Sequence, residues 1–320
     1  MQVVQPAMGR AAYLSLAAEE LSARAAAVRE MMRSCSLCPR RCGVDRLAGE
    51  LGTCRVGSEA VVSSYGPHFG EEKPLVGAHG SGTIFLAGCN LRCIFCQNYD
   101  ISQLHYGEAV PTDRIARMMI ALQDRGCHNI NLVTPTHQLP QILDALGKAA
   151  PLGLRLPLVY NCGGYESLEA LKLLDGIVDI YMPDMKYGDG RVAAELSGAA
   201  DYSERNREAV REMHRQVGDL EIADLSVGGR RYEVALRGLL VRHLVLPNGL
   251  AGTRQVVRFL AEEISRDTYI NIMDQYRPCF GAVGHEAIGR PIASDEYAEA
   301  VRLAREAGLW RFAESGGTNR

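Results

Sequence analysis

Six short runs of mainly apolar, often β-branched residues recur along the chain, separated by polar or helical segments. Most of these runs are apolar throughout, which is typical of strands covered on both faces and unlike the alternation of a half-exposed strand. The predicted strands are TIFLAG (83–88), NINLVT (129–134), PLVYN (157–161), IVDIYM (177–182), LLVRHLVL (239–246) and TYINIM (268–273). We therefore expect a sheet that is buried on both faces.

Segments with the spacing of amphipathic helices lie between several of these strands. One helix is predicted to begin at Thr112, a second at Ser167 and a third at Thr253, because serine and threonine are preferred at helix starts. Two further helices are predicted over 13–32 and 295–312. About six βα units in succession indicate an α/β fold, in which a parallel sheet with right-handed crossovers curls into a full or partial barrel.

Three parts are predicted along the chain. An N-terminal helix and a cysteine-rich segment occupy 1–58, the barrel occupies 59–290, and a C-terminal helix and tail over 291–320 pack on the barrel. The stretch 223–238 interrupts the alternation and predicts a hairpin that turns at its two adjacent glycines. We interpret this hairpin as a surface elaboration rather than a substrate-contacting arm.

The charge balance disfavours two classes of partner. The formal net charge is −3 and basic residues form only short runs, so we expect neither nucleic acid nor a membrane surface to bind. No stretch reaches the roughly 18 consecutive apolar residues of a membrane span, and the first residues lack the apolar core of a signal peptide. We expect a cytoplasmic protein, whose ten cysteines are ligands, catalysts or core residues rather than disulfides.

Three of these cysteines form a compact C-x3-C-x2-C motif directly after the first predicted strand. Cys89, Cys93 and Cys96 lie in the stretch GCNLRCIFCQN, and soft thiolates in so short a loop select an iron–sulfur cluster or zinc. A structural zinc site and an electron-transfer ferredoxin both require a fourth cysteine, but the next one, Cys127, comes 31 positions later. A four-iron cluster in this loop therefore keeps one iron without protein sulfur, and that position is open to a substrate or cofactor.

With this motif, the sequence resembles the radical S-adenosylmethionine (SAM) superfamily. The resemblance implies a partial (β/α)6 barrel with a 4Fe-4S cluster, in which Cys89, Cys93 and Cys96 are both metal ligands and the catalytic centre. It implies that SAM chelates the free iron and is cleaved by one electron to a 5′-deoxyadenosyl radical, which abstracts hydrogen from a substrate. It also implies an electron donor such as flavodoxin or ferredoxin, since reducing a sulfonium requires a cluster near the low end of the roughly −700 to +450 mV range.

Within the superfamily, the stretch GCNLRCIFCQNYDISQ resembles the activating-enzyme branch, whose best-known member activates pyruvate formate-lyase by forming a glycyl radical. This resemblance covers most of the chain. It implies that Phe95 packs near the adenine of SAM and that Asn161, in YNCGGYE, reaches the cofactor. Asp184 and Lys186, in MPDMKY, are implied to contact the methionine end, and Arg242, in VRHLVLPNG, the cofactor or the substrate backbone.

Two departures from the branch point to a sub-branch with its own target. The Gly-Gly-Glu segment that commonly meets the SAM amino group is replaced by LVTPTHQ, so Thr134 is assigned to the cofactor in its place. Where the glycyl-radical activases carry a late histidine, this sequence has NIMDQYRP, with Asp274 and Gln275 as substitutes. The target therefore need not be a glycyl radical enzyme.

A second group of cysteines lies near the N-terminus. Cys35, Cys38, Cys42 and Cys54 follow the pattern C-x2-C-x3-C-x11-C, and four thiols at these spacings suit a closed zinc site or a second iron–sulfur cluster in a segment too small for its own core. These residues do not distinguish zinc from iron, and a reduced, loosely structured segment is the alternative.

Three functions follow from these residues. The first is a radical SAM oxidoreductase of the activating type that abstracts hydrogen from a protein or peptide, with glycyl radical formation as one outcome. The second is a radical SAM enzyme that acts on a small molecule. The third is a non-catalytic metal-binding or electron-transfer module, in which Asp184 and Lys186 form an ordinary loop ion pair and Asn161 satisfies a turn.

Overall fold

Six parallel strands form the central sheet, in the order β2-β4-β5-β6-β8-β9. The structure is a computed structural model that describes residues 11–313. The strands are β2 Ser81–Leu86, β4 Ile130–Val133, β5 Leu158–Cys162, β6 Ile180–Pro183, β8 Arg230–Leu244 and β9 Tyr269–Met273. Each neighbouring pair in this order is parallel. All six predicted strands are confirmed, and the fold is a partial (β/α)6 barrel.

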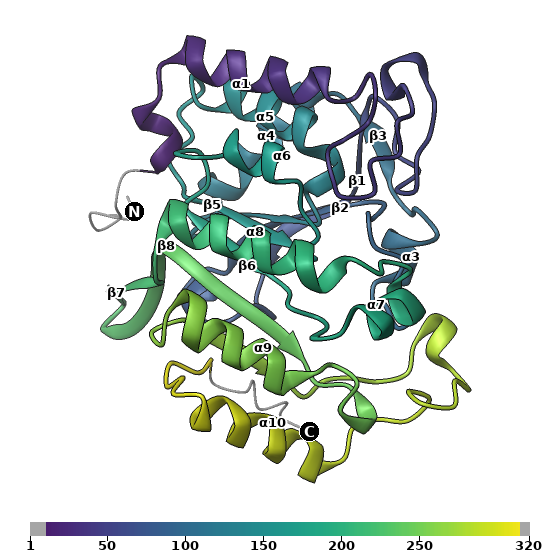
Figure 1. Cartoon of the computed structure of the whole chain (residues 1–320). Helices are drawn as coiled ribbons and strands as arrows, with labels where there is room; N and C mark the ends of the chain where they lie inside the picture. The colour runs from purple at the N-terminus through teal and green to yellow at the C-terminus, as the bar shows by residue number, and fades with distance from the viewer. Residues whose placement is uncertain (1–10, 314–320) are drawn as a thin grey trace.

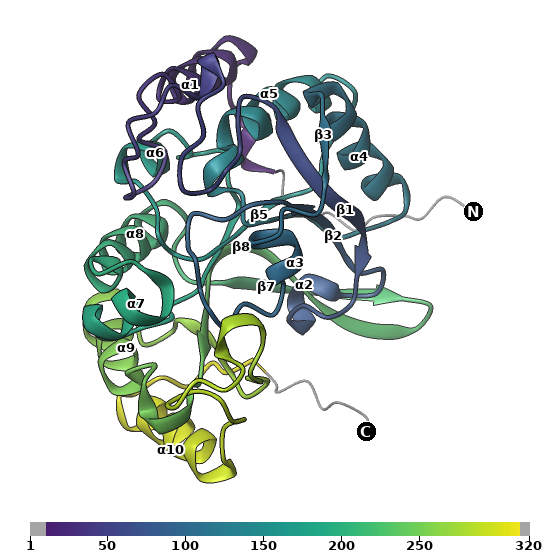
Figure 2. The same cartoon turned by 90° about the vertical axis from the view of Figure 1, so that its right-hand side faces the viewer.

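Helices follow most of the parallel strands and form an arc around the outer face of the sheet (Figure 2). They are α4 Thr112–Asp124, α5 Leu139–Ala149, α6 Leu168–Lys172, α7 Gly190–Ser197, α8 Tyr202–Val217 and α9 Thr253–Phe259, the last continued by a π-helical turn over Leu260–Ile264. Leu139, Ile142 and Leu146 are buried on one face of α5, as the helical spacing of apolar residues requires. The predicted start at Ser167 is confirmed, since its hydroxyl accepts from the Ala170 N–H.

The two outer helices are shorter than their sequence patterns predict. The first splits into a 3-10 turn over Ala12–Ser15 and α1 Ala18–Glu30, because Leu16 adopts an extended conformation. The last, α10 Ser294–Glu306, ends before Gly308, whose φ of +96° breaks the helix. In Figure 1, α1 lies over α5 and α10 lies beside α9. The predicted tail beyond residue 313 lies outside the described residues.

Three strands extend the parallel sheet in the antiparallel sense. The first, β1 (Ala60–His68), pairs with β2, and β3 (Glu108–Val110) pairs with the first residues of β1. At the other side, β7 (Glu221–Val227) pairs with the long first half of β8 and forms the predicted hairpin, which projects from the barrel (Figure 1). Sequence patterns did not predict β1 or β3.

Two short helices flank the ends of the first barrel strand. One, α2 (Lys73–Val76), precedes β2 and packs against β8. The other, α3 (Tyr99–Ser102), follows the cysteine motif. The motif therefore lies at the carboxyl end of β2, which is the end where parallel α/β folds collect their chemistry.

The cysteine-rich N-terminal segment is fastened to the barrel by polar contacts. Arg40 donates to the backbone carbonyls of Asn90 and Ser197 at 2.9 and 3.0 Å, and Ala12 N–H donates to Asp179 Oδ1 at 2.8 Å. The first of these contacts joins the segment to the loop of the C-x3-C-x2-C motif itself. Within residues 11–313, no helix is both long and apolar enough to cross a membrane.

Candidate active site

The loop after β2 places three thiols within a short stretch of backbone. Cys93 is buried, and Cys89 and Cys96 are half-buried. The loop starts at Gly88, where φ is +81° and a Cβ would lie 2.7 Å from the Cys54 carbonyl, so glycine is required there. The three thiols are buried to different degrees, and all three lie in the loop that directly follows the buried strand β2.

Each of these sulfur atoms accepts one hydrogen bond from the surrounding protein. The backbone N–H of Leu91 donates to Cys89 Sγ at 3.3 Å. Ser197 Oγ, at the end of α7, donates to Cys93 Sγ at 3.0 Å, and Ser102 Oγ, at the end of α3, donates to Cys96 Sγ at 3.1 Å. Donors to sulfur stabilise thiolate and raise the reduction potential of a bound iron–sulfur cluster, so these three groups are arranged for metal-bound sulfur.

The thiols are electrostatically coupled to each other and to a lysine. Burial raises the pKa of Cys89, and the neighbouring Cys93 and Cys96 raise it further. Burial also raises the pKa of Cys93, while the Lys186 ammonium opposes this change. Burial thus disfavours the thiolate forms of Cys89 and Cys93, and a bound metal would supply the charge that stabilises them.

Lys186 and Asp184, from the loop after β6, form an ion pair beside the cysteines. Lys186 Nζ lies 2.6 Å from Asp184 Oδ2, and each side chain is about one-fifth exposed, with values of 18% and 23%. Burial works against the charge of Lys186, but the Asp184 carboxylate and Cys93 outweigh it and raise the pKa of the ammonium. The structure thus brings both predicted residues next to the predicted metal site, with their charged groups still accessible.

Two residues of α8 hold this loop in place. Tyr202 OH donates to the carbonyls of Gly163 and Asp184 at 2.8 and 3.0 Å, and Asn206 Nδ2 donates to the Asp184 carbonyl at 2.9 Å. A Cβ at Gly164 would lie 2.2 Å from Asn206 Nδ2, so only glycine fits at this position of the loop after β5. Sequence analysis missed these two residues, because it predicted no helix over 202–217 and their hydrogen-bond partners lie in loops far from them along the chain.

Asn161 and Thr134 face each other across the ends of β5 and β4. Thr134 N–H donates to the Asn161 carbonyl at 2.8 Å, and Thr134 has a φ of +58°, which is uncommon for a β-branched residue. The Asn161 side chain is 9% exposed and makes no hydrogen bond to the described part of the chain. Its amide therefore remains free to bind a ligand, although its predicted contact with the cofactor stays a prediction.

Phe95, which lies within the cysteine loop, packs in an aromatic cluster. It is 4% exposed and meets Tyr187 and Tyr276 edge to face, with ring centroids 6.3 and 6.0 Å apart. Tyr187 OH also lies 2.6 Å from Ser197 Oγ, the donor to Cys93. The cluster therefore fixes the loop, and the adenine contact predicted for Phe95 stays a prediction.

Arg242 is engaged inside the barrel rather than left free at its end. The guanidinium pairs with Glu72 at 2.6 Å and with Glu71, and Glu72 also accepts from Asn271 Nδ2 at 2.7 Å. Burial disfavours the charged form of Arg242. The two carboxylates outweigh this effect and raise the pKa of the guanidinium well above its usual value. The predicted contact of Arg242 with cofactor or substrate stays a prediction, and sequence analysis missed both of its carboxylate partners.

A second buried acid lies in the loop after β5. Glu166 accepts from Thr136 Oγ1 at 2.8 Å and from Tyr160 OH at 2.9 Å. Burial raises the pKa of Glu166 to about 7, although these hydroxyl groups oppose the change. This carboxyl therefore titrates near neutral pH.

The four N-terminal cysteines line one small, largely enclosed cavity. Its walls include Cys35, Cys38, Cys42 and Cys54, together with Asn90 of the C-x3-C-x2-C loop. Burial raises the pKa of Cys38 to about 12. The structure thus brings together all four cysteines of the second predicted group and places them against the first.

Two nitrogen atoms in the wall of this cavity lack partners. Arg46 is fully buried, with Nη1 3.9 Å from Cys35 Sγ, and its Nε makes no hydrogen bond. His137 donates through Nε2 to the Ala87 carbonyl at 2.8 Å, and its Nδ1 is also without a partner. A buried guanidinium beside thiols lacks a counter-charge, whereas four metal-bound thiolates would supply one, so the residues fit a metal centre.

No group of three or more His, Cys, Asp or Glu side chains within residues 11–313 is placed to hold a single metal ion. This holds for both cysteine groups. What marks the two cysteine groups as candidate metal sites is the set of hydrogen-bond donors and charged groups around their sulfur atoms, not a preformed set of ligands.

Comparisons with known proteins agree with this site. Residues 83–234, which include the cysteine motif and its surrounding loops, match the radical SAM superfamily. The uncharacterized protein MJ0674 of Methanocaldococcus jannaschii is 31% identical over 291 residues, which cover 88% of this chain and 77% of that protein.

Two solved structures resemble the fold loosely. A radical SAM methyltransferase from Sphaerobacter thermophilus has a TM-score of 0.43 and 13% identity over 72% of this chain and 66% of its own. The hydrogenase maturase HydG from Carboxydothermus hydrogenoformans has a TM-score of 0.45 and 11% identity over 69% of this chain and 49% of its own. The chain thus spans less than two thirds of either protein. On the motif, the barrel and the superfamily match over residues 83–234, this chain belongs to the radical SAM superfamily.

Proposed function

We propose that this radical SAM enzyme is of the activating type and abstracts hydrogen from a protein or peptide. The observation that carries the proposal is the loop of Cys89, Cys93 and Cys96, in which every sulfur has its own hydrogen-bond donor and Lys186 lies alongside. When bound, a 4Fe-4S cluster supplies the electron that cleaves SAM to a 5′-deoxyadenosyl radical. The resemblance of GCNLRCIFCQNYDISQ to activating enzymes supports the protein substrate.

The chain offers charged and polar groups suited to the methionine end of SAM. The Lys186 ammonium complements a carboxylate, and the Asp184 carboxylate both complements an ammonium and fixes the position of Lys186. The free amide of Asn161 adds a donor and an acceptor at the neighbouring strand end. Tyr202 and Asn206 hold the loop of Asp184 rigid, so these groups need little reorganisation when a ligand arrives.

Exposed aromatic residues near the cysteine loop support a macromolecular substrate over a small molecule. Tyr99, three residues after Cys96, stacks on Phe280 with ring centroids 5.3 Å apart, and 44% of Phe280 is exposed. Tyr106 and Val283, in the same two segments, are also largely exposed. Exposed apolar side chains gathered in this way are typical of surfaces that meet another protein.

The electron donor is an acidic one-electron carrier of the flavodoxin or ferredoxin class. Arg55 and Arg92 are exposed on the two cysteine loops, and both lie close enough to His105 to lower its pKa, in addition to the effect of burial. This group of basic side chains is local, since the whole chain is acidic. Such a patch attracts an acidic partner to the side of the molecule that carries the cysteines.

The N-terminal cysteines hold a second metal centre. The cavity shared by Cys35, Cys38, Cys42 and Cys54, with the uncompensated Arg46 in its wall, supports this proposal. A metal there ties a segment without a core of its own to the loop of the active site. Its identity is tested by measuring iron, acid-labile sulfide and zinc in protein purified without oxygen.

The proposed reaction is tested with anaerobically reconstituted protein, dithionite and SAM. Candidate partner proteins are added, and a carbon-centred radical is sought by electron paramagnetic resonance. A protein-borne doublet that appears only with SAM and partner is expected. If SAM is cleaved but the radical or the product is found only with small molecules, the activating-type assignment is wrong.

A further inference from the structure

One edge of the sheet is open beside the amino half of β2, beyond the part of β1 that β3 covers. The short strand β3 pairs with only the first residues of β1, from Ala60 opposite Val110 to Val62 opposite Glu108. Beyond Val62, no strand in the described part of the chain pairs with the outer edge of β1. An edge of this kind presents backbone groups to which another extended chain can bind.

The ladder between β1 and β2 shows which backbone groups point outward. Gly82 donates its N–H to the Asn129 carbonyl on the β4 side, so its backbone groups point away from β1. Gly82 and Pro67 lie opposite each other and form a non-hydrogen-bonded pair, so the backbone groups of Pro67 point away from β2. Because the facing direction alternates along a strand, the N–H and C=O of Tyr65 point outward as well. Tyr65 is 43% exposed, and its outward backbone groups have no strand partner in the described residues.

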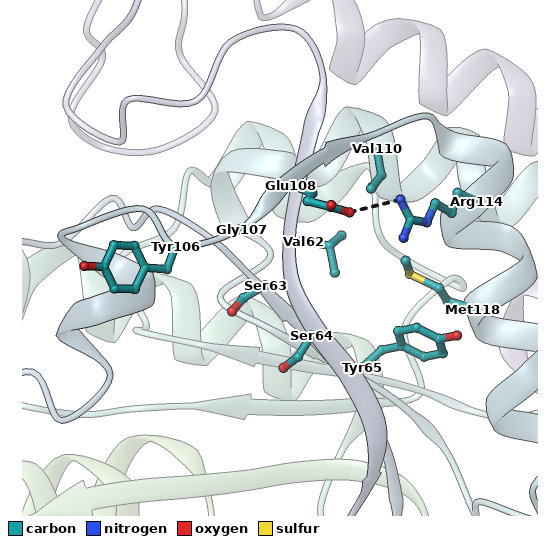
Figure 3. Close-up of a pocket in the computed structure, with 10 residues that line it drawn as sticks. All are labelled: Val62, Ser63, Ser64, Tyr65, Tyr106, Gly107, Glu108, Val110, Arg114 and Met118. Carbon is teal, nitrogen blue, oxygen red and sulfur yellow. Dashed lines mark hydrogen bonds and ion pairs between the residues drawn. The ribbon is translucent and has the colours of Figure 1, made fainter.

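A groove of about 610 Å³ runs beside this edge. Figure 3 shows Met118 and Arg114 of α4 on the same side of β1 as the Tyr65 ring, and Val62 and Val110 also line the groove. Arg114 Nη1 pairs with Glu108 at 3.1 Å at the upper end of the groove. The groove therefore combines an apolar floor, a charged end and a free strand edge, which together suit an extended peptide rather than a helix or a small molecule.

We propose that an extended segment of the protein substrate binds here by adding a strand to the outer edge of β1. The proposal rests on the proposed protein or peptide substrate and adds the place where that substrate docks. The backbone of the segment pairs with Tyr65, and an apolar side chain of the segment lies on Met118. Alternate side chains of a bound strand point to opposite faces, so every second residue of the segment contributes to recognition.

Only the upper end of the open edge, next to the residues that β3 covers, lies near the cysteine loop. Val62 pairs with Leu86, two residues before Gly88 and the cysteine loop, and Tyr106 lies in the segment that follows Cys96. A strand laid along the open edge therefore lies opposite the amino half of β2, and its upper end meets Tyr106 in the segment that follows the cysteines.

Two features keep this edge from pairing over a long stretch with a second copy of the chain. A β-bulge lies between Val62 and Ser64, and Pro67 lacks an N–H. Pairing is thus restricted to a few residues around Tyr65. Restriction of this kind is how natural edge strands avoid aggregation while staying open to a specific partner.

The test uses the full, reconstituted protein and a phage-displayed random heptapeptide library. The strongest binder is synthesised and serves as the probe, and its dissociation constant is measured by fluorescence anisotropy. Tyr65→Pro removes the outward N–H without removing a bond to β2, whereas Tyr65→Ala removes only the side chain. We expect Tyr65→Pro to weaken binding by at least about tenfold, as for an unmade backbone hydrogen bond, and Tyr65→Ala to weaken it less.

Amide hydrogen exchange on the wild-type protein provides a readout that does not depend on any variant. The probe is expected to slow exchange at residues 63–68 and not in the β7–β8 hairpin. Four results would each overturn the proposal. They are a library without any binding peptide, slowed exchange outside residues 63–68, equal effects of the two Tyr65 variants, and slowed exchange at residues 63–68 in a peptide-free dimer. SAM cleavage is measured separately on the same samples: cleavage without peptide binding refutes only the docking site, and binding without cleavage refutes only the proposed function.

Discussion

Ser197 Oγ donates to Cys93 Sγ at 3.0 Å and joins the end of α7 to the metal-binding loop. The hydroxyl is itself held by Tyr187 OH at 2.6 Å, and Tyr187 packs edge to face on Phe95 from the same loop. A residue 104 positions away from Cys93 in sequence thus completes the environment of one sulfur. The potential of the bound cluster should depend on this contact.

Ser197→Ala removes the donor to Cys93. Since hydrogen bonds to sulfur favour the reduced cluster, we expect the midpoint potential of the reconstituted cluster to become more negative, with slower SAM cleavage at a fixed reductant concentration. Electron paramagnetic resonance during a redox titration measures the potential. Ser203→Ala is the control, because Ser203 donates to the Tyr187 carbonyl and not to a sulfur; equal potentials for the two variants would contradict the prediction.

Arg242→Met leaves Glu71 and Glu72 as unpaired buried carboxylates. Breaking a buried ion pair from one side costs on the order of 3–5 kcal/mol, so the thermal midpoint Tm should fall markedly. Adding Glu71→Gln and Glu72→Gln should recover most of the loss, because no unpaired charge then remains. A triple variant as unstable as the single one would show that the ion pairs do not govern this part of the core.

The same triple variant tests the predicted cofactor contact of Arg242. SAM affinity is measured by equilibrium dialysis below the Tm of both proteins. Weaker binding by the triple variant supports the contact, and unchanged binding refutes it.

Glu166→Gln should change how stability depends on pH. The pKa of Glu166 is raised by burial from 4.5 in the unfolded chain to about 7 in the folded protein. The folded protein therefore binds the proton more tightly, and the stability present below pH 4.5 is lost as the pH rises through 7. At about 1.36 kcal/mol per pKa unit, this loss is about 3 kcal/mol, and the glutamine variant avoids it.

The measurement compares Tm between pH 5 and pH 8. The advantage of Glu166→Gln over the wild-type protein should grow across this range. Glu204→Gln, at an exposed position of α8, serves as the control and should show no such growth. An advantage independent of pH would mean that Glu166 does not titrate in this range.

Cys38→Ser should remove the second metal centre without removing the first. We expect the total metal content to fall by one centre, because Cys38 lies in the wall of the four-cysteine cavity. Cys127→Ala is the matched control, since Cys127 is buried and belongs to neither group. Metal analysis after desalting gives the content; equal values for Cys38→Ser and the wild-type protein would contradict the assignment.

Sequence patterns predicted those features whose residues are neighbours along the chain. The six parallel strands were visible as apolar runs, and the motif of Cys89, Cys93 and Cys96 carries its ligands within eight positions. Asp184 and Lys186 were assigned through the resemblance of MPDMKY to the activating-enzyme branch, and they too are only two residues apart.

Features built from distant residues could not be predicted. Glu72 meets Arg242 across 170 positions, and only the closed barrel brings them together. The strand β1 was missed because its AVVSSYGPH sequence contains glycine and proline, which disfavour strands. Arg46 was missed because a single arginine in a polar segment gives no sign that the fold will bury it completely.

The formation of 5′-deoxyadenosine tests the central claim most directly. Anaerobically reconstituted protein is mixed with dithionite and SAM, and the product is measured by liquid chromatography and mass spectrometry. We predict 5′-deoxyadenosine from the wild-type protein and from Cys127→Ala, and none from Cys93→Ala, which keeps the N-terminal cysteines. Equal product from Cys93→Ala, or no product from the fully loaded wild-type protein, would contradict the account.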